Sequence, residues 1–281
     1  MSSNRKEAAM NREYFRFVFI ILLTACFLIM SCTETPVENE ETPPVMPSAE
    51  TMTIDLSLFG NSGAQSAAKA GIPESKLNFG AAALTLSVVN ITLALHLAIP
   101  VVLWGTALSQ DPVLATDGKF HWIYSAESGW VTYEADLAGW VDVENPSVHW
   151  EMGVTQSVLH LDDFIWYDGS CNITATEGSW RFFDYRQPDQ PVQVVRIDWQ
   201  IQDETHRLLE FENVFQGDAN LGDVLSYQID GDTARVQYFD HSENVTAKII
   251  WSLNTHAGYL QFPNYHDGIP AHWNENLDDV N

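Results

Sequence analysis

Few residues of this chain have the types and spacing that catalysis or metal binding requires. His266 and His272 stand among acidic residues, but their spacing fits no zinc motif. Ser66 and Lys69 have the Ser-x-x-Lys spacing of an amine-activated nucleophile, yet the Ser-Asp-Asn and Lys-Thr-Gly motifs that complete such a site are absent. Phosphate-loop, dinucleotide and zinc-protease motifs are also missing. The sequence therefore predicts no catalytic residue, no metal ligand and no cofactor.

Two polar residues lie in the longest uncharged stretch that follows residue 31, which runs from Asn78 to Leu108. Asn90 and His96 are surrounded there by aliphatic side chains. If this stretch lines a cavity, they are the natural polar contacts for a bound molecule, because small-molecule sites combine apolar walls with a few polar groups. The alternative is that His96 is a hydrogen-bonded core histidine. We predict Asn90 and His96 as ligand-binding residues.

The Asn78–Leu108 stretch must itself be positioned by the fold. As a helix it is apolar on all sides, which is typical of an enclosed helix. Alternating Val89, Ile91 and Leu93 also fit a strand, and the length fits a membrane span. Because strands are usually about 3 to 10 residues long, we favour a helix. We expect this helix, residues 78–108, to be fully buried.

Short alternating segments rich in Trp, Tyr, Phe and Val follow from residue 119 to residue 262, separated by Gly, Asp, Asn and Pro. This spacing is typical of an antiparallel meander. Asp230-Gly231 predicts a tight hairpin of type I′. The sequence thus predicts an α+β fold, mainly β, in which a curved sheet or barrel of about a dozen strands packs around the 78–108 helix. Residues 54–281 would form this one domain, with an irregular tail at 263–281.

The first 31 residues predict a processing segment. Four basic residues precede the apolar run Phe17–Met30. Ile29-Met30-Ser31-Cys32 then resembles the lipobox of bacterial lipoproteins, which implies that Cys32 is lipidated and becomes the mature N-terminus. Cys26 is the alternative lipidation site, because the residues before it match the lipobox more closely. Cleavage there would leave a short apolar segment at the mature N-terminus. An ordinary cleaved signal peptide is the other alternative.

Residues 32–53 are rich in Pro, Glu and Thr, so we expect a disordered acidic tether between the lipid and the domain. The resemblance to lipoproteins implies a Gram-negative cell envelope and an outer-membrane lipoprotein facing the periplasm or the cell surface. The formal net charge of −25 argues against nucleic acid as a partner, because phosphate binding needs basic surface. The membrane, reached through the lipid, is the predicted partner.

Ten tryptophans distinguish the chain, and most fall in the predicted strands. We expect them to fill the core, or else to line a cavity or an exposed platform. The sequence therefore favours a non-catalytic, lipid-anchored envelope protein that binds an apolar ligand or a partner protein, similar in architecture to lipid carriers and lipocalins. A glycan-binding module and a carboxylate-dependent hydrolase are the alternatives.

Overall fold

The structure is a computed structural model that describes residues 42–60 and 73–280, except for the side chains at positions 60, 90–92, 94 and 95. The predicted processing segment, Cys26, Cys32 and the Ser66–Lys69 pair lie outside the described residues. Pro43–Asn281 forms one compact unit, and it contains every residue of the described hydrophobic core.

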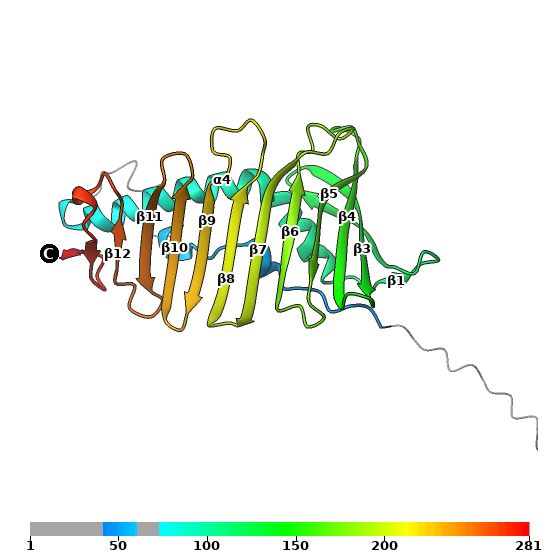
Figure 1. The fold of residues 1–281 in the computed structure, drawn as a ribbon, viewed down its shortest axis with the longest axis horizontal. Helices are drawn as coiled ribbons and strands as arrows, with labels where there is room; N and C mark the ends of the chain where they lie inside the picture. The colour runs from blue at the N-terminus through cyan, green and yellow to red at the C-terminus, as the bar shows by residue number, and fades with distance from the viewer. Residues whose placement is uncertain (1–41, 61–72, 281) are drawn as a thin grey trace, which may run out of the picture. The chain divides into compact units, whose positions relative to one another are not determined.

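An antiparallel sheet dominates this unit (Figure 1). In the described residues it has fourteen strands, and each strand pairs with its neighbours in the chain, which confirms the predicted mainly β meander. The first and last strands are not paired with each other, so the sheet is open and the predicted barrel is wrong. The strands are β1 (Val113–Leu114), β2 (Phe120–Ser128), β3 (Val131–Asp142), β4 (Ser147–Gln156), β5 (Leu161–Cys171), β6 (Glu177–Phe183), β7 (Gln193–Asp203), β8 (His206–Asn213), β9 (Val224–Asp230), β10 (Thr233–Asp240), β11 (Val245–Ser252), β12 (Gly258–Gln261), β13 (Ala271–Trp273) and β14 (Asp279–Val280).

The sheet continues beyond the predicted limits. The segment 263–281, expected to be irregular, contains β13 and β14, and Ala271 and Trp273 are buried in the core.

At the β9–β10 hairpin the two turn residues are Gly231 and Asp232, one position later than predicted, and only Gly231 has a positive φ of 59°. The turn is therefore not type I′, which needs positive φ at both central residues.

Five helical segments accompany the sheet in the part of the chain that the structure describes, and one of them is long. Leu77–Ala107 forms helix α4 and continues through Pro100. Because Pro100 has no N–H, the carbonyl of His96, four residues earlier, lacks its α-helical partner. The others are short: η1 (Ala49–Met52), α2 (Ser57–Gly60), η2 (Glu74–Lys76) and η3 (His266–Gly268).

Helix α4 is held at its two ends by opposite edges of the sheet (Figure 1). At its start, the backbone N–H groups of Leu77 and Asn78 donate to the Asp279 carboxylate of β14 at 3.1 and 2.9 Å, an acidic cap that suits the positive end of the helix dipole. Near its end, the Tyr124 hydroxyl of β2 donates to the Leu103 carbonyl at 2.5 Å. A helix of 31 residues is about 46 Å long, enough to cross most of the strands at about 4.8 Å each.

The enclosure predicted for this helix is not found. Leu84 and Val88 are 61% and 57% exposed, and Val102 is also exposed. An open sheet covers only one side of a helix, so the opposite side faces solvent. Within residues 42–60 and 73–280, no helix combines the length and the apolar character that crossing a membrane requires.

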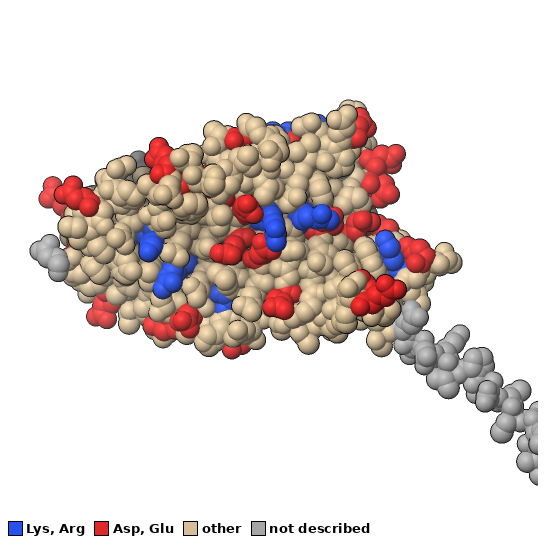
Figure 2. Space-filling model, in the orientation of Figure 1, with Lys and Arg blue, Asp and Glu red and all other residues tan. Residues whose placement is uncertain are grey.

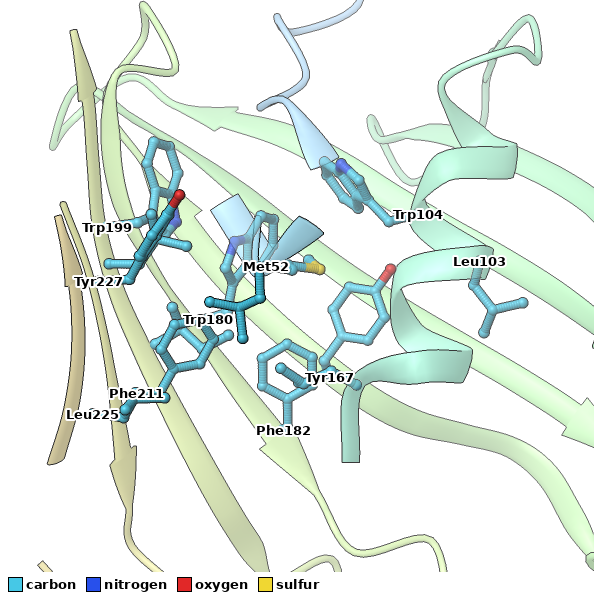
Figure 3. Packing of buried hydrophobic residues seen from close by; sticks show 14 of the residues in the cluster. Met52, Leu103, Trp104, Tyr167, Trp180, Phe182, Trp199, Phe211, Leu225 and Tyr227 are labelled. Carbon is cyan, nitrogen blue, oxygen red and sulfur yellow. The ribbon is translucent and has the colours of Figure 1, made fainter. Parts of the chain in front are cut away.

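The segment that precedes the helices fills one part of the inner face of the sheet. Thr51 and Met52 are buried, and Pro47 accepts a hydrogen bond from Trp104 Nε1 at 3.0 Å. Figure 3 shows Met52 among Trp104, Tyr167 and Trp180. This corrects the predicted tether, because residues from about 46 onward belong to the core.

The outer face of the sheet, which lies away from α4, is polar. Figure 2 shows acidic and basic side chains interspersed across it. Arg181 of β6 forms a bidentate ion pair with Asp168 of β5 at 2.7 Å, and Arg196 pairs with Asp198 at 2.8 Å. The sheet therefore has its hydrophobic core on the helix side only.

Candidate functional site

A cavity of about 1160 Å³ lies between the middle of α4 and the inner face of the sheet. We call this cavity the groove. Its roof is the α4 stretch from Leu84 to Leu97, which includes the exposed Leu84 and Val88, so the groove reaches the surface. Its floor is mainly apolar and comes from β5 to β11, with Trp166, Phe182, Phe211 and Leu225 buried. The volume is above the range of about 300–1,000 Å³ usual for small-molecule pockets.

The groove exists because α4 is anchored at its ends and not in its middle. Short hydrophobic segments fill the space beside each anchor: Met52 packs near Trp104, and Phe59 of α2 stacks on Phe79 at 5.3 Å between ring centroids. Between these two filled regions, aliphatic residues of α4 face aromatic residues of the sheet across the cavity. The groove is thus an unfilled part of an otherwise continuous core.

Polar residues gather at one end of the groove because the meander brings two long loops together. Hairpins of an antiparallel meander alternate between the two ends of the strands, so the β6–β7 and β8–β9 loops lie at the same end. The first loop supplies Asp184 and Arg186, and the second supplies Asp218 and Asn220. We call this group, with Asp223 at the start of β9 and Tyr238 of β10, the polar end.

Asp184 and Arg186 form the one tight ion pair of the polar end among the described residues. Arg186 Nε and Nη2 donate to the two carboxylate oxygens of Asp184 at 2.8 and 2.9 Å. The Asp184 side chain is only 4% exposed, whereas that of Arg186 is 64% exposed. The hydrogen bond from Arg186 is the main reason why the pKa of Asp184 is lowered. The pair is therefore ionised at neutral pH, and its charges cancel.

The other two carboxylates of the polar end are held by neutral donors. Asp218 accepts the backbone N–H of Asn220 at 2.9 Å, which lowers the pKa of Asp218. Asp223 is buried and accepts the Tyr238 hydroxyl together with the backbone N–H of His241 at 2.9 Å. Burial and this contact raise the pKa of Tyr238, which remains a phenol at neutral pH.

The structure places His96 in the roof of the groove, close to the polar end. His96 is exposed at the surface, but partial desolvation of its ring, and then the charge of Arg186, lower the pKa of His96 below its ordinary value. Its ring is therefore uncharged at neutral pH and offers one donor and one acceptor. Asn90 lies in the same stretch of α4, but its side chain is outside the described part of the helix. The assignment of both residues to ligand binding stays a prediction.

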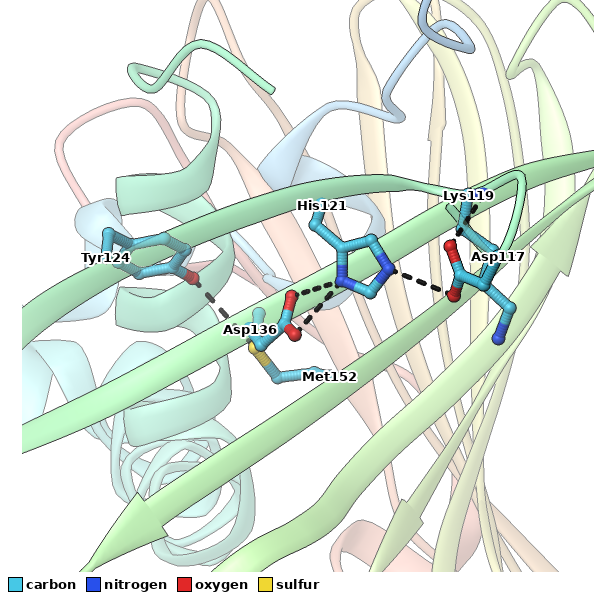
Figure 4. Close-up of polar contacts among 6 residues, drawn as sticks. All are labelled: Asp117, Lys119, His121, Tyr124, Asp136 and Met152. Atoms are coloured by element: carbon cyan, nitrogen blue, oxygen red, sulfur yellow. Dashed lines mark hydrogen bonds and ion pairs between the residues drawn. The ribbon is translucent and has the colours of Figure 1, made fainter. Parts of the chain in front are cut away.

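A histidine on the outer face looks more like a catalytic group but is not arranged as one. His121 Nδ1 lies 2.8 Å from Asp136 Oδ1, and its Nε2 lies 3.2 Å from Asp117 Oδ2 (Figure 4). Burial alone would lower the pKa of His121, but the hydrogen bonds to the two carboxylates raise it overall. Since both ring nitrogens face carboxylates, neither is free to take a proton from a nucleophile. This group stabilises a protonated histidine on the sheet.

A second cavity, of about 430 Å³, lies on the outer face beside this cluster. Glu134 and Asp136 of β3 and Asp163 of β5 line it, so carboxylates from two strands do approach each other there. Asp136 is already engaged by His121, and we assign this cavity no catalytic role. Among the described residues no group of acids, histidines and cysteines is arranged to hold a metal ion, including His266 and His272.

The tryptophans are divided unevenly between core and surface. Eight of them are buried: Trp104, Trp122, Trp150, Trp166, Trp180, Trp199, Trp251 and Trp273. Trp140 stacks on His149 with 5.4 Å between ring centroids, and Trp130, in the β2–β3 turn, is 97% exposed. The described surface thus lacks the flat row of exposed aromatic rings that a glycan platform needs.

The sequence interpretation included His96 and missed the rest of the polar end. Asp184, Arg186, Asp218 and Tyr238 come from two loops and a strand, with no shared motif or spacing. The one signal that was available is the length of the 184–192 and 214–223 segments, because long loops often carry binding residues. Comparisons with protein-family models, with curated proteins and with solved structures find no match to this chain.

Proposed function

We propose that this protein is a lipid-anchored, non-catalytic protein of the bacterial cell envelope that binds an apolar, chain-like ligand in the groove beneath α4. The groove carries this proposal. It is large, walled by aliphatic and aromatic side chains, open at its roof, and polar at one end only. A large apolar surface that opens to solvent is typical of a binding site, because proteins rarely leave such surface in contact with water without using it.

The proposed anchor rests on sequence. Cys32 would carry the lipid, and residues 33 to about 45 would connect it to the compact unit. An outer-membrane lipoprotein facing the periplasm or the cell surface would then hold the groove near the membrane, where apolar molecules are found. The membrane remains the partner that this reading implies.

Native mass spectrometry of Pro43–Asn281, purified gently from a bacterial host, tests ligand binding. This start keeps Met46, Pro47 and Met52, which the domain boundary expected from sequence would have removed. We expect a co-purifying mass of lipid size. A folded protein with a clean apo mass that also fails to take up an added apolar probe would overturn the proposal.

A matched pair of variants locates the ligand. Ala247 of β11 lines the groove, so Ala247→Phe places a ring in the cavity and should abolish the bound mass. Thr246 is the next residue in the same strand and is exposed on the opposite face, so Thr246→Phe adds a similar ring outside the groove. We expect Thr246→Phe to retain the ligand. Equal effects of the two variants would contradict binding in the groove.

Metabolic labelling with a radioactive fatty acid tests the anchor in the full chain. Cys32→Ser should abolish the label and release the protein from membranes, whereas Cys26→Ser should leave both unchanged. Labelling lost only in Cys26→Ser would move the anchor to Cys26. Labelling of neither wild type nor variants would refute lipidation.

A further inference from the structure

We propose that the groove selects amphiphiles with an ammonium head group over those with an anionic head group. This inference rests on the proposed function and adds the chemical class of the ligand. The charges and the aromatic rings of the polar end favour this selectivity.

The polar end has more negative than positive charge. Arg186 is matched by Asp184 through two hydrogen bonds, so this pair contributes no net charge. Asp218, whose pKa is lowered, carries a negative charge, and Asp223 beside it accepts two hydrogen bonds. Among the described residues no lysine or arginine approaches either side chain to ion-pair distance. A carboxylate or phosphate placed here would be repelled by the Asp218 charge, whereas a cation would be attracted.

His96 does not restore the balance, because its ring is neutral at neutral pH. A neutral imidazole ring offers one acceptor nitrogen. His96 therefore adds an acceptor in the roof of the groove to the carboxylates on the loop side.

Aromatic rings stand at the same end of the groove. Tyr185 follows Asp184 directly and contacts Trp166 with 5.3 Å between ring centroids. Phe215 and Tyr238 also line the groove. The faces of aromatic rings attract cations, and quaternary ammonium ions are often bound by several rings together with carboxylates. Carboxylates beside aromatic rings, at the end of an apolar groove, fit a long-chain amine or a quaternary ammonium amphiphile.

Three probes with the same chain and different heads test this selectivity: dodecyltrimethylammonium, dodecanol and dodecanoate. Binding to Pro43–Asn281 is measured by calorimetry below the micellar concentration and at physiological salt, which screens long-range attraction to an acidic protein. We expect the ammonium probe to bind at least about tenfold tighter than the alcohol, and the carboxylate at least about tenfold weaker, each tenfold corresponding to about 1.4 kcal/mol.

A matched pair of charge variants separates local from long-range effects. Asp218→Asn keeps the Oδ1 acceptor for the Asn220 N–H and removes one charge from the polar end. Asp111→Asn removes the same charge beyond the end of α4, at an exposed residue outside the groove lining. We expect Asp218→Asn to reduce the ammonium-to-alcohol affinity ratio about threefold to tenfold and Asp111→Asn to leave it unchanged.

The outcomes distinguish the two proposals. If dodecanol binds and Ala247→Phe blocks it, but dodecanoate binds as tightly as the ammonium probe, the head-group inference is wrong and groove binding stands. If both charge variants reduce the ratio equally, the preference is a property of the whole acidic chain, and the inference is also wrong. If no probe binds, groove binding itself fails, and the inference fails with it.

Discussion

The two halves of the space beneath α4 differ in how they are filled. Under the last turns of the helix, Trp104 meets Trp150 and Trp180 with ring centroids 5.4 and 4.9 Å apart, and Met52 is 1% exposed among them. Under the stretch from Leu84 to Leu97, the same sheet and the same helix enclose a cavity of about 1160 Å³. We call these the packed half and the hollow half.

The N-terminal segment, and not the helix, decides where the core is complete. Residues 46–52 insert beside Trp104, whereas no described residue of that segment lines the groove. Stability should therefore depend on the packed half and binding on the hollow half.

Removal of the inserted segment should have the largest effect. A chain that starts at Ile54 lacks Thr51 and Met52 and leaves the indole N–H groups of Trp104 and Trp180 without partners. Two or three lost side chains and two orphaned donors should cost more than about 5 kcal/mol, most of the stability of an ordinary domain. Urea unfolding compared with the chain from Pro43 measures this loss. Equal stability of the two chains would mean that the segment is only a tether.

Truncation of one leucine in each half should give unequal costs. Leu103 is 0% exposed in the packed half, so Leu103→Ala should cost about 2–5 kcal/mol. Leu93 is partly buried and already borders the cavity, so Leu93→Ala opens little new void and should cost about 1 kcal/mol or less. Chemical denaturation of both variants without ligand provides the comparison. Costs within error of each other would break the distinction between the halves.

Deletion of one hydroxyl group in each half should also give unequal costs. Thr51 accepts Trp180 Nε1–H at 3.0 Å, so Thr51→Val leaves this buried indole donor unpaired and should cost about 1–3 kcal/mol. The Ser48 carbonyl, to which the Thr51 hydroxyl donates at 2.9 Å, keeps the backbone N–H of residue 51. Thr85 lines the groove and donates only to the Ala81 carbonyl of its own helix. Thr85→Val should cost less than about 0.5 kcal/mol. A larger loss at Thr85 than at Thr51 would contradict the argument.

The smallest effect should come from the titration of His96 in the hollow half. Its pKa is lowered in the folded protein, so between that value and 6.5 the unfolded chain binds more protons. The His96 contribution to stability is therefore present above about pH 6.5 and is lost as the pH falls through the folded pKa. Nuclear magnetic resonance of the imidazole protons measures the shift, and His96→Gln should remove this part of the pH dependence. A folded pKa at or above 6.5 would show that the ring is not desolvated in the groove.

The strands of the sheet could be predicted from the sequence, whereas the openness of the sheet, the inserted N-terminal segment and most of the polar end could not. Alternating residues such as Trp122 and Tyr124 reveal strands because side chains of a strand alternate between two faces. Closure cannot be predicted in this way, because the alternation is the same in an open sheet and in a barrel. The inserted segment was missed because Pro and Glu dominate its composition, and two methionines among them give no periodic signal. The polar end was missed because its residues meet only through the topology.

The cap on α4 has a consequence for the order of folding. Hairpins between chain neighbours close short loops, and the whole sheet is built of such pairs. The N–H groups of Leu77 and Asn78 instead wait for Asp279, 202 and 201 residues later in the chain. Closing so long a loop costs more entropy, so we expect the helix to dock after the meander has formed. Until then the apolar face of the sheet is exposed to neighbouring chains, and aggregation competes with the final step.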